Sequence, residues 1–204
     1  MPLTQQNNND HIHSFKVILI GSQGSGKSNI ISRYCKNQFS EERICLNSHI
    51  EIFANREYIQ ADNKDQRVPL VIYDTSGYDE PYTKLYYQSA DACMVVYDVT
   101  DIESYNSVAR LVGHFKHPAD LPFILVGNKS DAPNRVISQE QADELAKSLG
   151  ENVLHYFVSA KTGENIEIAF HELAQAIYDC YSKKFSDHVW ANDVPKYKKG
   201  CCGK

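Results

Sequence analysis

One eight-residue segment near the N-terminus restricts the fold of this 204-residue chain more than any other part of the sequence. It follows an apolar run, opens a segment of helical spacing, and reads Gly21-Ser22-Gln23-Gly24-Ser25-Gly26-Lys27-Ser28. Such glycines let backbone N–H groups converge on phosphate oxygens, the Lys adds positive charge, and the Ser hydroxyl can ligate magnesium. A plain Gly/Ser-rich turn would not need all of these features together. The segment therefore predicts a phosphate-binding loop, which by itself leaves ATP and GTP open.

The rest of the chain alternates Val- and Ile-rich runs with segments of helical spacing, which is typical of an α/β fold with helices on both faces of a mostly parallel sheet. We expect six strands, of which the second is the weakest: Phe15 to Ile20, Ile50 to Phe53, Val68 to Tyr73, Ala92 to Asp98, Phe123 to Asn128 and His155 to Ser159. Pro69 lacks a backbone donor, so its strand should pair with the weak strand in a hairpin whose tip is Gln60 to Arg67.

Two helices carry clear signals. Ser138 and Gln141 form a capping box for a helix that should stop at Gly150. The last helix is marked by apolar residues at helical spacing, namely Ile166, Phe170, Leu173 and Ile177.

Composition limits the class of protein. Length, a hydrophobic share of 42% and a charged share of 23% fit one globular domain, which we place at 14–185 between tails at 1–13 and 186–204. No apolar run approaches the roughly 20 residues that span a bilayer, and the polar N-terminus lacks the pattern of a secretory signal, so we expect a cytosolic chain. The net charge of -5 argues against a nucleic-acid partner. Four cysteines are scattered singly, and only Cys201 and Cys202 form a pair.

The segment Asn128-Lys129-Ser130-Asp131 directly follows a buried strand, where ligands bind in sheets of this kind. A carboxylate at Asp131 can accept from both the ring N–H and the exocyclic amine of guanine, a donor pair that adenine lacks. An exposed polar turn before Pro133 is the alternative, and the phosphate loop weakens it. The segment therefore predicts a guanine pocket.

Two further features belong to the same pocket. Ser159-Ala160-Lys161 follows the last strand and would supply a backbone N–H and a lysine stem. Phe39, eleven residues after Ser28, would either lay its ring over the base or pack in the core as an aromatic after the first helix.

The magnesium side is predicted at Asp74-Thr75-Ser76-Gly77, after the third strand. Asp74 would hold the ion through water, and the Gly77 N–H would lie near a γ-phosphate. The alternative is that Asp74 only caps a helical turn.

These motifs, in this order and spacing, resemble the Ras superfamily of small GTPases over residues 14 to 182. The resemblance implies the small G-protein form of the P-loop NTPase fold, GTP/GDP and Mg2+ as cofactors, and a switch between two nucleotide states. Within the superfamily, the chain is most similar to the Rab branch through the Cys pair near its end and two segments, Tyr86-Tyr87-Gln88-Ser89-Ala90 and Asp98-Val99-Thr100-Asp101-Ile102-Glu103-Ser104-Tyr105.

The Rab resemblance implies a role in vesicle traffic and geranylgeranylation of both Cys201 and Cys202. Two lipids would anchor the chain to the cytoplasmic face of an intracellular or plasma membrane, with a cytosolic pool, and nearby lysines would attract anionic headgroups. The same resemblance implies effectors that read the GTP state, an exchange factor, a GTPase-activating protein, and chaperones for prenyl transfer and membrane extraction.

Three positions depart from the family. The usual water-orienting Gln is replaced by Tyr78, which we expect to impair catalysis, and the third loop residue is Gln23, which would crowd an arginine finger or, less favourably, replace the missing Gln. The first switch offers Leu46-Asn47-Ser48-His49 where the family has a magnesium-ligating Thr, so Asn47 or Ser48 would serve. We therefore expect a GTPase with slow hydrolysis. The alternatives are a GTP-binding scaffold without significant hydrolysis and a small-molecule kinase. The kinase alternative is the weaker one, because the sequence shows no recognisable acceptor-binding lid and because a kinase would leave the guanine pocket unexplained.

Overall fold

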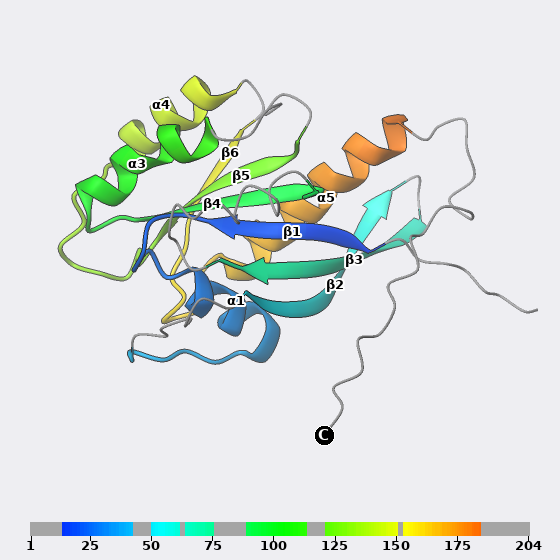
Figure 1. The fold of residues 1–204 in the computed structure, drawn as a ribbon, viewed down its shortest axis with the longest axis horizontal. Helices are drawn as coiled ribbons and strands as arrows, with labels where there is room; N and C mark the ends of the chain where they lie inside the picture. Colours follow the sequence, from blue (N-terminus) through cyan, green and yellow to red (C-terminus); the bar gives the residue numbers. More distant parts are fainter. Residues whose placement is uncertain are drawn as a thin grey trace, which may run out of the picture.

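The computed structural model describes residues 14–42, 50–61, 64–75, 89–113, 121–150 and 153–184. Their strands are β1 (Phe15–Ile20), β2 (Glu51–Ala61), β3 (Lys64–Asp74), β4 (Ala92–Asp98), β5 (Phe123–Asn128) and β6 (Leu154–Phe157), and their helices are α1 (Lys27–Lys36), α3 (Ile102–Val112), α4 (Gln139–Leu149) and α5 (Ile166–Lys184). The six strands form one sheet in the order β2-β3-β1-β4-β5-β6 (Figure 1). Every neighbouring pair is parallel except β2–β3. The predicted fold class is confirmed.

The sheet separates two hydrophobic cores. Because neighbouring residues of a strand point to opposite faces, Val17 and Leu19 of β1 pack in one core and Ile18 and Ile20 in the other. The first core contains side chains of α1 and α5, and the second contains side chains of α3 and α4. These buried strands have apolar residues on both faces, which explains why they read as continuous apolar runs.

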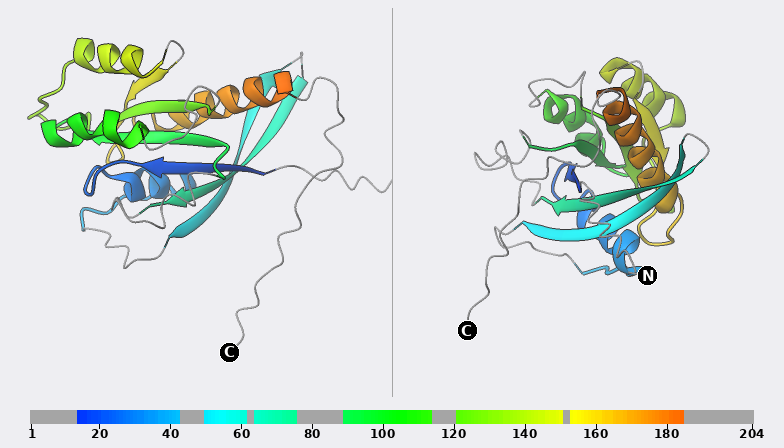
Figure 2. Two further views of the ribbon diagram at one scale, coloured as in Figure 1. Left: turned by 45° about the horizontal axis from the view of Figure 1, so that its top comes forward. Right: turned by 90° about the vertical axis from the view of Figure 1, so that its right-hand side faces the viewer.

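The β2–β3 hairpin is longer than the sequence suggested. The predicted tip at Gln60 to Arg67 is wrong, because Tyr58 pairs with Arg67 and Gln60 pairs with Asp65, which leaves only residues 62 and 63 between the strands. This part of the hairpin lies beyond β1 and close to α5 (Figure 2). Ile59 is buried in the first core, but most of the other side chains here are polar, so the pairing left no apolar alternation in the sequence.

Pro69 lies where the sequence placed it, in the hairpin. It pairs with Arg56 of β2, whereas the register between β1 and β3 begins only at Leu70. No β1 residue is therefore paired with Pro69, and the missing N–H weakens no bond on that side of β3.

The predicted helix signals are confirmed. Ser138 Oγ accepts from the Gln141 N–H while the Ser138 N–H donates to Gln141 Oε1, and α4 ends at Leu149 with Gly150 as its C-cap. The four apolar markers of α5 are all buried in the first core. None of the described helices is long and apolar enough to cross a membrane. The tails predicted at 1–13 and 186–204 lie outside the described residues.

Candidate functional site

The predicted phosphate loop connects β1 to α1, and its glycines are required by close approaches. A Cβ on Gly21 would lie 2.1 Å from the Val96 carbonyl oxygen, and a Cβ on Gly26 would lie 2.1 Å from Asn128 Nδ2. Gly24 and Gly26 also have φ values of 84° and 96°, in the region that side chains rarely adopt. The backbone of the loop is therefore packed directly against the ends of β4 and β5.

Lys27 lies buried under this loop. Its Nζ donates to the carbonyl oxygens of Gly21 at 2.9 Å and Ser22 at 3.0 Å. Burial lowers the pKa of Lys27 to about 8, and the nearby Asp74 carboxylate opposes this shift. The ammonium is thus held at the loop, beside the backbone groups that would face a phosphate.

The predicted magnesium residues meet at the same place. Asp74, at the end of β3, is 1% exposed and accepts a hydrogen bond from the Ser28 hydroxyl. Burial raises the Asp74 pKa to about 6, although Ser28 and Lys27 both act to lower it. Its Oδ1 atom has no hydrogen-bond partner, nor does the buried Ser25 hydroxyl. A magnesium–phosphate group would fit here, because it needs oxygen ligands and donors at this spot.

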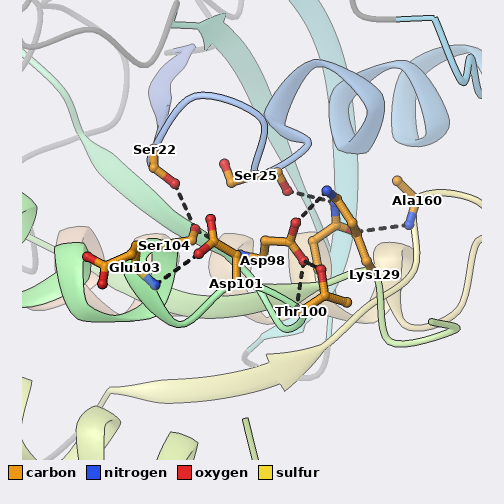
Figure 3. Close-up of polar contacts among 10 residues, drawn as sticks. Ser22, Ser25, Asp98, Thr100, Asp101, Glu103, Ser104, Lys129 and Ala160 are labelled. Carbon is orange, nitrogen blue, oxygen red and sulfur yellow. Dashed lines mark hydrogen bonds and ion pairs between the residues drawn. The ribbon is translucent and has the colours of Figure 1, made fainter. Parts of the chain in front are cut away.

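Asn128 joins the phosphate loop to the predicted base loops. Its Nδ2 donates to the Ser25 carbonyl at 2.9 Å, and its Oδ1 accepts from the Ala160 N–H at 3.1 Å. Three segments far apart in the sequence are therefore connected by one buried amide. Figure 3 labels the two residues that it connects, Ser25 and Ala160.

The remaining residues of the predicted guanine pocket are also brought together. Ser159 Oγ donates to Asp131 Oδ1 at 2.6 Å, and it accepts from the Thr162 N–H at 3.0 Å. We expected β6 to continue to Ser159, but β6 ends at Phe157 because the Ser159 N–H bonds to the Glu164 carbonyl in a local turn. Ser159, Ala160 and Lys161 thus form a loop, which we call the base loop, and it orients Asp131.

The structure adds two residues, Asp98 and Ser104, to which sequence reasoning gave no role in the site. Lys129 Nζ lies 2.5 Å from Asp98 Oδ2, and Asp98 also accepts from the Thr100 N–H and hydroxyl (Figure 3). Ser104 Oγ lies 2.7 Å from Ser22 Oγ and accepts from the Asp98 N–H. Asp98 could have been found by its position, since it ends a parallel strand at the edge where the other site residues lie. Ser104 has no such signal.

Other predicted residues lie apart or outside the description. Phe39 is partly buried against the first core, which fits the core alternative, and Gln23 is exposed on the loop. Six of the predicted residues lie outside the described part of the chain: Asn47, Ser48, Gly77, Tyr78, Cys201 and Cys202. Among the described residues, no three His, Cys, Asp or Glu side chains gather as a metal site.

A sequence profile of the Ras family matches residues 16–179. The chain belongs to the Ras family. Among the relatives of this Ras-family chain are three Rab or Ypt proteins. Ras-related protein Rab2BV of Beta vulgaris is 36% identical over 86% of this chain and 81% of the relative. Ras-related protein YPTC6 of Chlamydomonas reinhardtii is 35% identical over 97% and 90%. Ypt/Rab-type GTPase YPT7 of Saccharomyces cerevisiae is 32% identical over 79% and 80%.

These likenesses make the chain a Rab-like member of the Ras superfamily, as the sequence motifs predicted. Membership implies GTPase activity, and Ras-family GTPases in general bind GTP or GDP with Mg2+ and act with effectors, exchange factors and activating proteins.

Proposed function

We propose that this chain is a Rab-like molecular switch for vesicle or membrane traffic that binds guanine nucleotide through the phosphate loop, Asn128 to Asp131 and the base loop. The observation that carries the proposal is the position of Asn128. Its amide connects the phosphate loop to the base loop, so the two ends of one nucleotide would be held at a fixed spacing.

The charges of the site suit this ligand. Lys27 has a pKa of about 8, so it is largely protonated at pH 7 and can pair with phosphate oxygens. Magnesium would be held by the Ser28 hydroxyl and, through water, by Asp74, and it would neutralise charge on the phosphates. With its Oδ1 held by Ser159, Asp131 is oriented to accept from guanine.

The switch itself is proposed for residues 43–51 and 77–88, with Asn47 or Ser48 near magnesium and the Gly77 N–H near the γ-phosphate. GTP would order these segments into a surface for effectors, and hydrolysis would release them. The output of the protein is then binding rather than a product.

We expect hydrolysis to be slow. A phenol at Tyr78 cannot offer the paired donor and acceptor of an amide to the attacking water, and positioning of that water is most of what phosphoryl transfer requires. Gln23 is exposed on the phosphate loop, where its side chain would crowd an incoming arginine. A chain of this kind would stay loaded with GTP for long periods or cycle mainly by exchange.

The membrane part of the proposal is a geranylgeranyl anchor on Cys201 and Cys202. Two chains give stable attachment where one is marginal, and the lysines of the last nine residues would add attraction to anionic lipids. Prenyl transfer and extraction would then require dedicated chaperones.

Single-turnover hydrolysis of bound GTP tests the function. We expect slow hydrolysis in the wild type, an increase of about tenfold or more in Tyr78→Gln, and loss of guanine preference in Asp131→Asn. Asp65→Asn, an exposed carboxylate change in the distant hairpin, is the matched control and should alter neither property.

Fast hydrolysis in the wild type would contradict the role given to Tyr78, and Gln23→Ala would then show whether Gln23 orients the water. A GTP-binding scaffold is the second candidate, favoured by Tyr78. It predicts the same protease sensitivity with GTP and GDP, whereas a switch predicts protection of residues 43–51 and 77–88 by GTP.

A further inference from the structure

The side chain of Arg33 in α1 makes four hydrogen bonds, and two of them reach a loop far away in the sequence. Its Nε donates to the Ala160 carbonyl at 2.9 Å and its Nη2 donates to the Lys161 carbonyl at 2.7 Å. Its Nη1 donates to the Asn37 carbonyl at 3.1 Å and to Asn37 Oδ1 at 2.8 Å. One guanidinium therefore joins the base loop to the residue that ends α1.

The contacts from Arg33 to the base loop use a geometry that only arginine provides. Two neighbouring N–H groups of the planar fork meet two successive carbonyl oxygens, and a charged donor makes each bond stronger than a neutral one. A lysine at this position would keep the charge but could not hold both carbonyls in one plane. The bonds span 127 and 128 residues of sequence, so they fix tertiary placement rather than helix structure.

The base loop held by Arg33 is the one that orients Asp131. Ser159, next to Ala160, donates to Asp131 Oδ1, and the Ala160 N–H donates to Asn128. A shift of the two carbonyls would therefore move both the residue that reads guanine and the amide that joins it to the phosphate loop.

The segment after α1 is tied to the same region. The side-chain amide of Asn29 makes two hydrogen bonds to the backbone of Ser40: Nδ2 donates to the Ser40 carbonyl at 2.9 Å, and Oδ1 accepts from the Ser40 N–H at 3.2 Å. At the next residue, Glu41 Oε1 accepts from Lys161 Nζ at 3.0 Å. Both side chains of the last pair are exposed, so this ion pair adds little by itself. Arg33, which is half-buried, is the firmer of the two connections to the base loop.

We propose that Arg33 is a positioning residue for guanine recognition, which fixes the base loop through the Ala160 and Lys161 carbonyls without touching the nucleotide. The inference rests on the proposed function, since it names a residue that supports the same pocket. It implies that weakening Arg33 reduces the discrimination between nucleotides that differ only at the groups facing Asp131.

The test compares GDP with inosine diphosphate, which lacks the exocyclic amine, by measuring dissociation rates from the purified full-length protein. In Arg33→Lys, GDP should dissociate about three- to tenfold faster, and the ratio of the two rates should move towards one, because the contact of Asp131 with the amine is weakened. A change of overall stability alone would speed both nucleotides equally. Arg33→Gln provides a second truncation, and thermal unfolding with GDP bound verifies that each variant is folded.

The matched control is Asn37→Gly. It removes the side-chain acceptor at the end of α1, keeps a residue suited to the φ of 53°, and leaves both bonds to the base loop. Its rate ratio should equal that of the wild type. The inference would be overturned if the ratio of the two dissociation rates were unchanged in Arg33→Lys. It would also be overturned if the ratio moved towards one by the same amount in Asn37→Gly. Failure of the wild type to bind either nucleotide would instead reject the proposed function.

Discussion

Two glycines of the phosphate loop differ in what a side chain would meet. Gly24 and Gly26 both have positive φ, so any other residue is strained at either position. A Cβ on Gly24 would have open space, whereas a Cβ on Gly26 would collide with Asn128 Nδ2. The pair therefore separates backbone strain from disruption of the link between the phosphate loop and the base loop.

We predict that Gly26→Ala weakens GDP binding at least about tenfold more than Gly24→Ala, because it displaces the Asn128 amide from Ser25 and Ala160. Titration with a fluorescent GDP analogue measures both variants. Strain alone should cost each of them about 1–3 kcal/mol of stability, measured by denaturant unfolding. Equal losses of affinity would mean that the Asn128 link does not contribute to binding.

Among the elements, α5 contributes most clearly to the first core. Six of its apolar residues are almost fully buried, and Phe170 stacks on Tyr34 of α1 with ring centroids 3.7 Å apart. The helix also carries Ile168, which is 51% exposed, in contrast to Ile177 at 0%. One helix thus offers the same substitution in two environments.

Replacement of Ile177 by Ala should lower the free energy of unfolding by about 2–5 kcal/mol, since it removes buried methyl groups and leaves a cavity. Replacement of Ile168 by Ala should change it by no more than about 0.5 kcal/mol, because little buried surface is lost and Ala favours the helix. Urea unfolding of both variants measures the difference. Similar losses would show that Ile168 is covered by a contact that its exposure does not reveal.

At the scale of the whole molecule, stability should depend on pH through groups from several elements. The side chain of His155 in β6 is 2% exposed, with Nε2 3.0 Å from the Tyr97 hydroxyl and Nδ1 3.7 Å from Asp143. Burial lowers its pKa to about 4, while Asp143 opposes and Arg135 reinforces the shift. The fold therefore favours the neutral ring. The contribution of His155 to the free energy of unfolding is complete above pH 6.5 and is lost as the pH falls towards 4.

Asp74 titrates in an overlapping range with the opposite sign. Its pKa is raised from 3.8 to about 6, so the folded state favours the protonated carboxyl. The contribution of Asp74 to the free energy of unfolding is therefore present at low pH and is lost as the pH rises through that range. The two effects partly cancel in the wild type. Only a comparison between proteins that share Asp74 can isolate the effect of His155.

We predict that the stability of the wild type relative to His155→Gln falls by about 3 kcal/mol between pH 6.5 and pH 4. Gln can still accept from the Tyr97 hydroxyl, and it does not titrate. Denaturant unfolding of both proteins across this range provides the measurement. A difference that stays constant with pH would show that His155 is not desolvated as its position implies.

Much of the molecule was predicted from local patterns. The sheet class, three strands with correct bounds, the capping box of α4 and the apolar face of α5 follow from hydrophobic periodicity and turn chemistry. The distal half of the hairpin was missed because, apart from the buried Ile59, its paired residues are mostly polar, so its alternation of inward and exposed positions gives no apolar period. Hydrophobic periodicity and turn chemistry predict a helix or strand only when its apolar side chains mark the face that is buried.

The candidate site divides in the same way. The sequence by itself determined which residues carry the chemistry, because phosphate and guanine recognition require particular groups after particular strands. Only the tertiary structure decided how they are held, through Asn128 between two loops, Lys129 against Asp98, and Arg33 beneath the base loop. These contacts join segments 31 to 128 residues apart, and the distance between such segments is set by the packing of helices on the sheet, which no local pattern records.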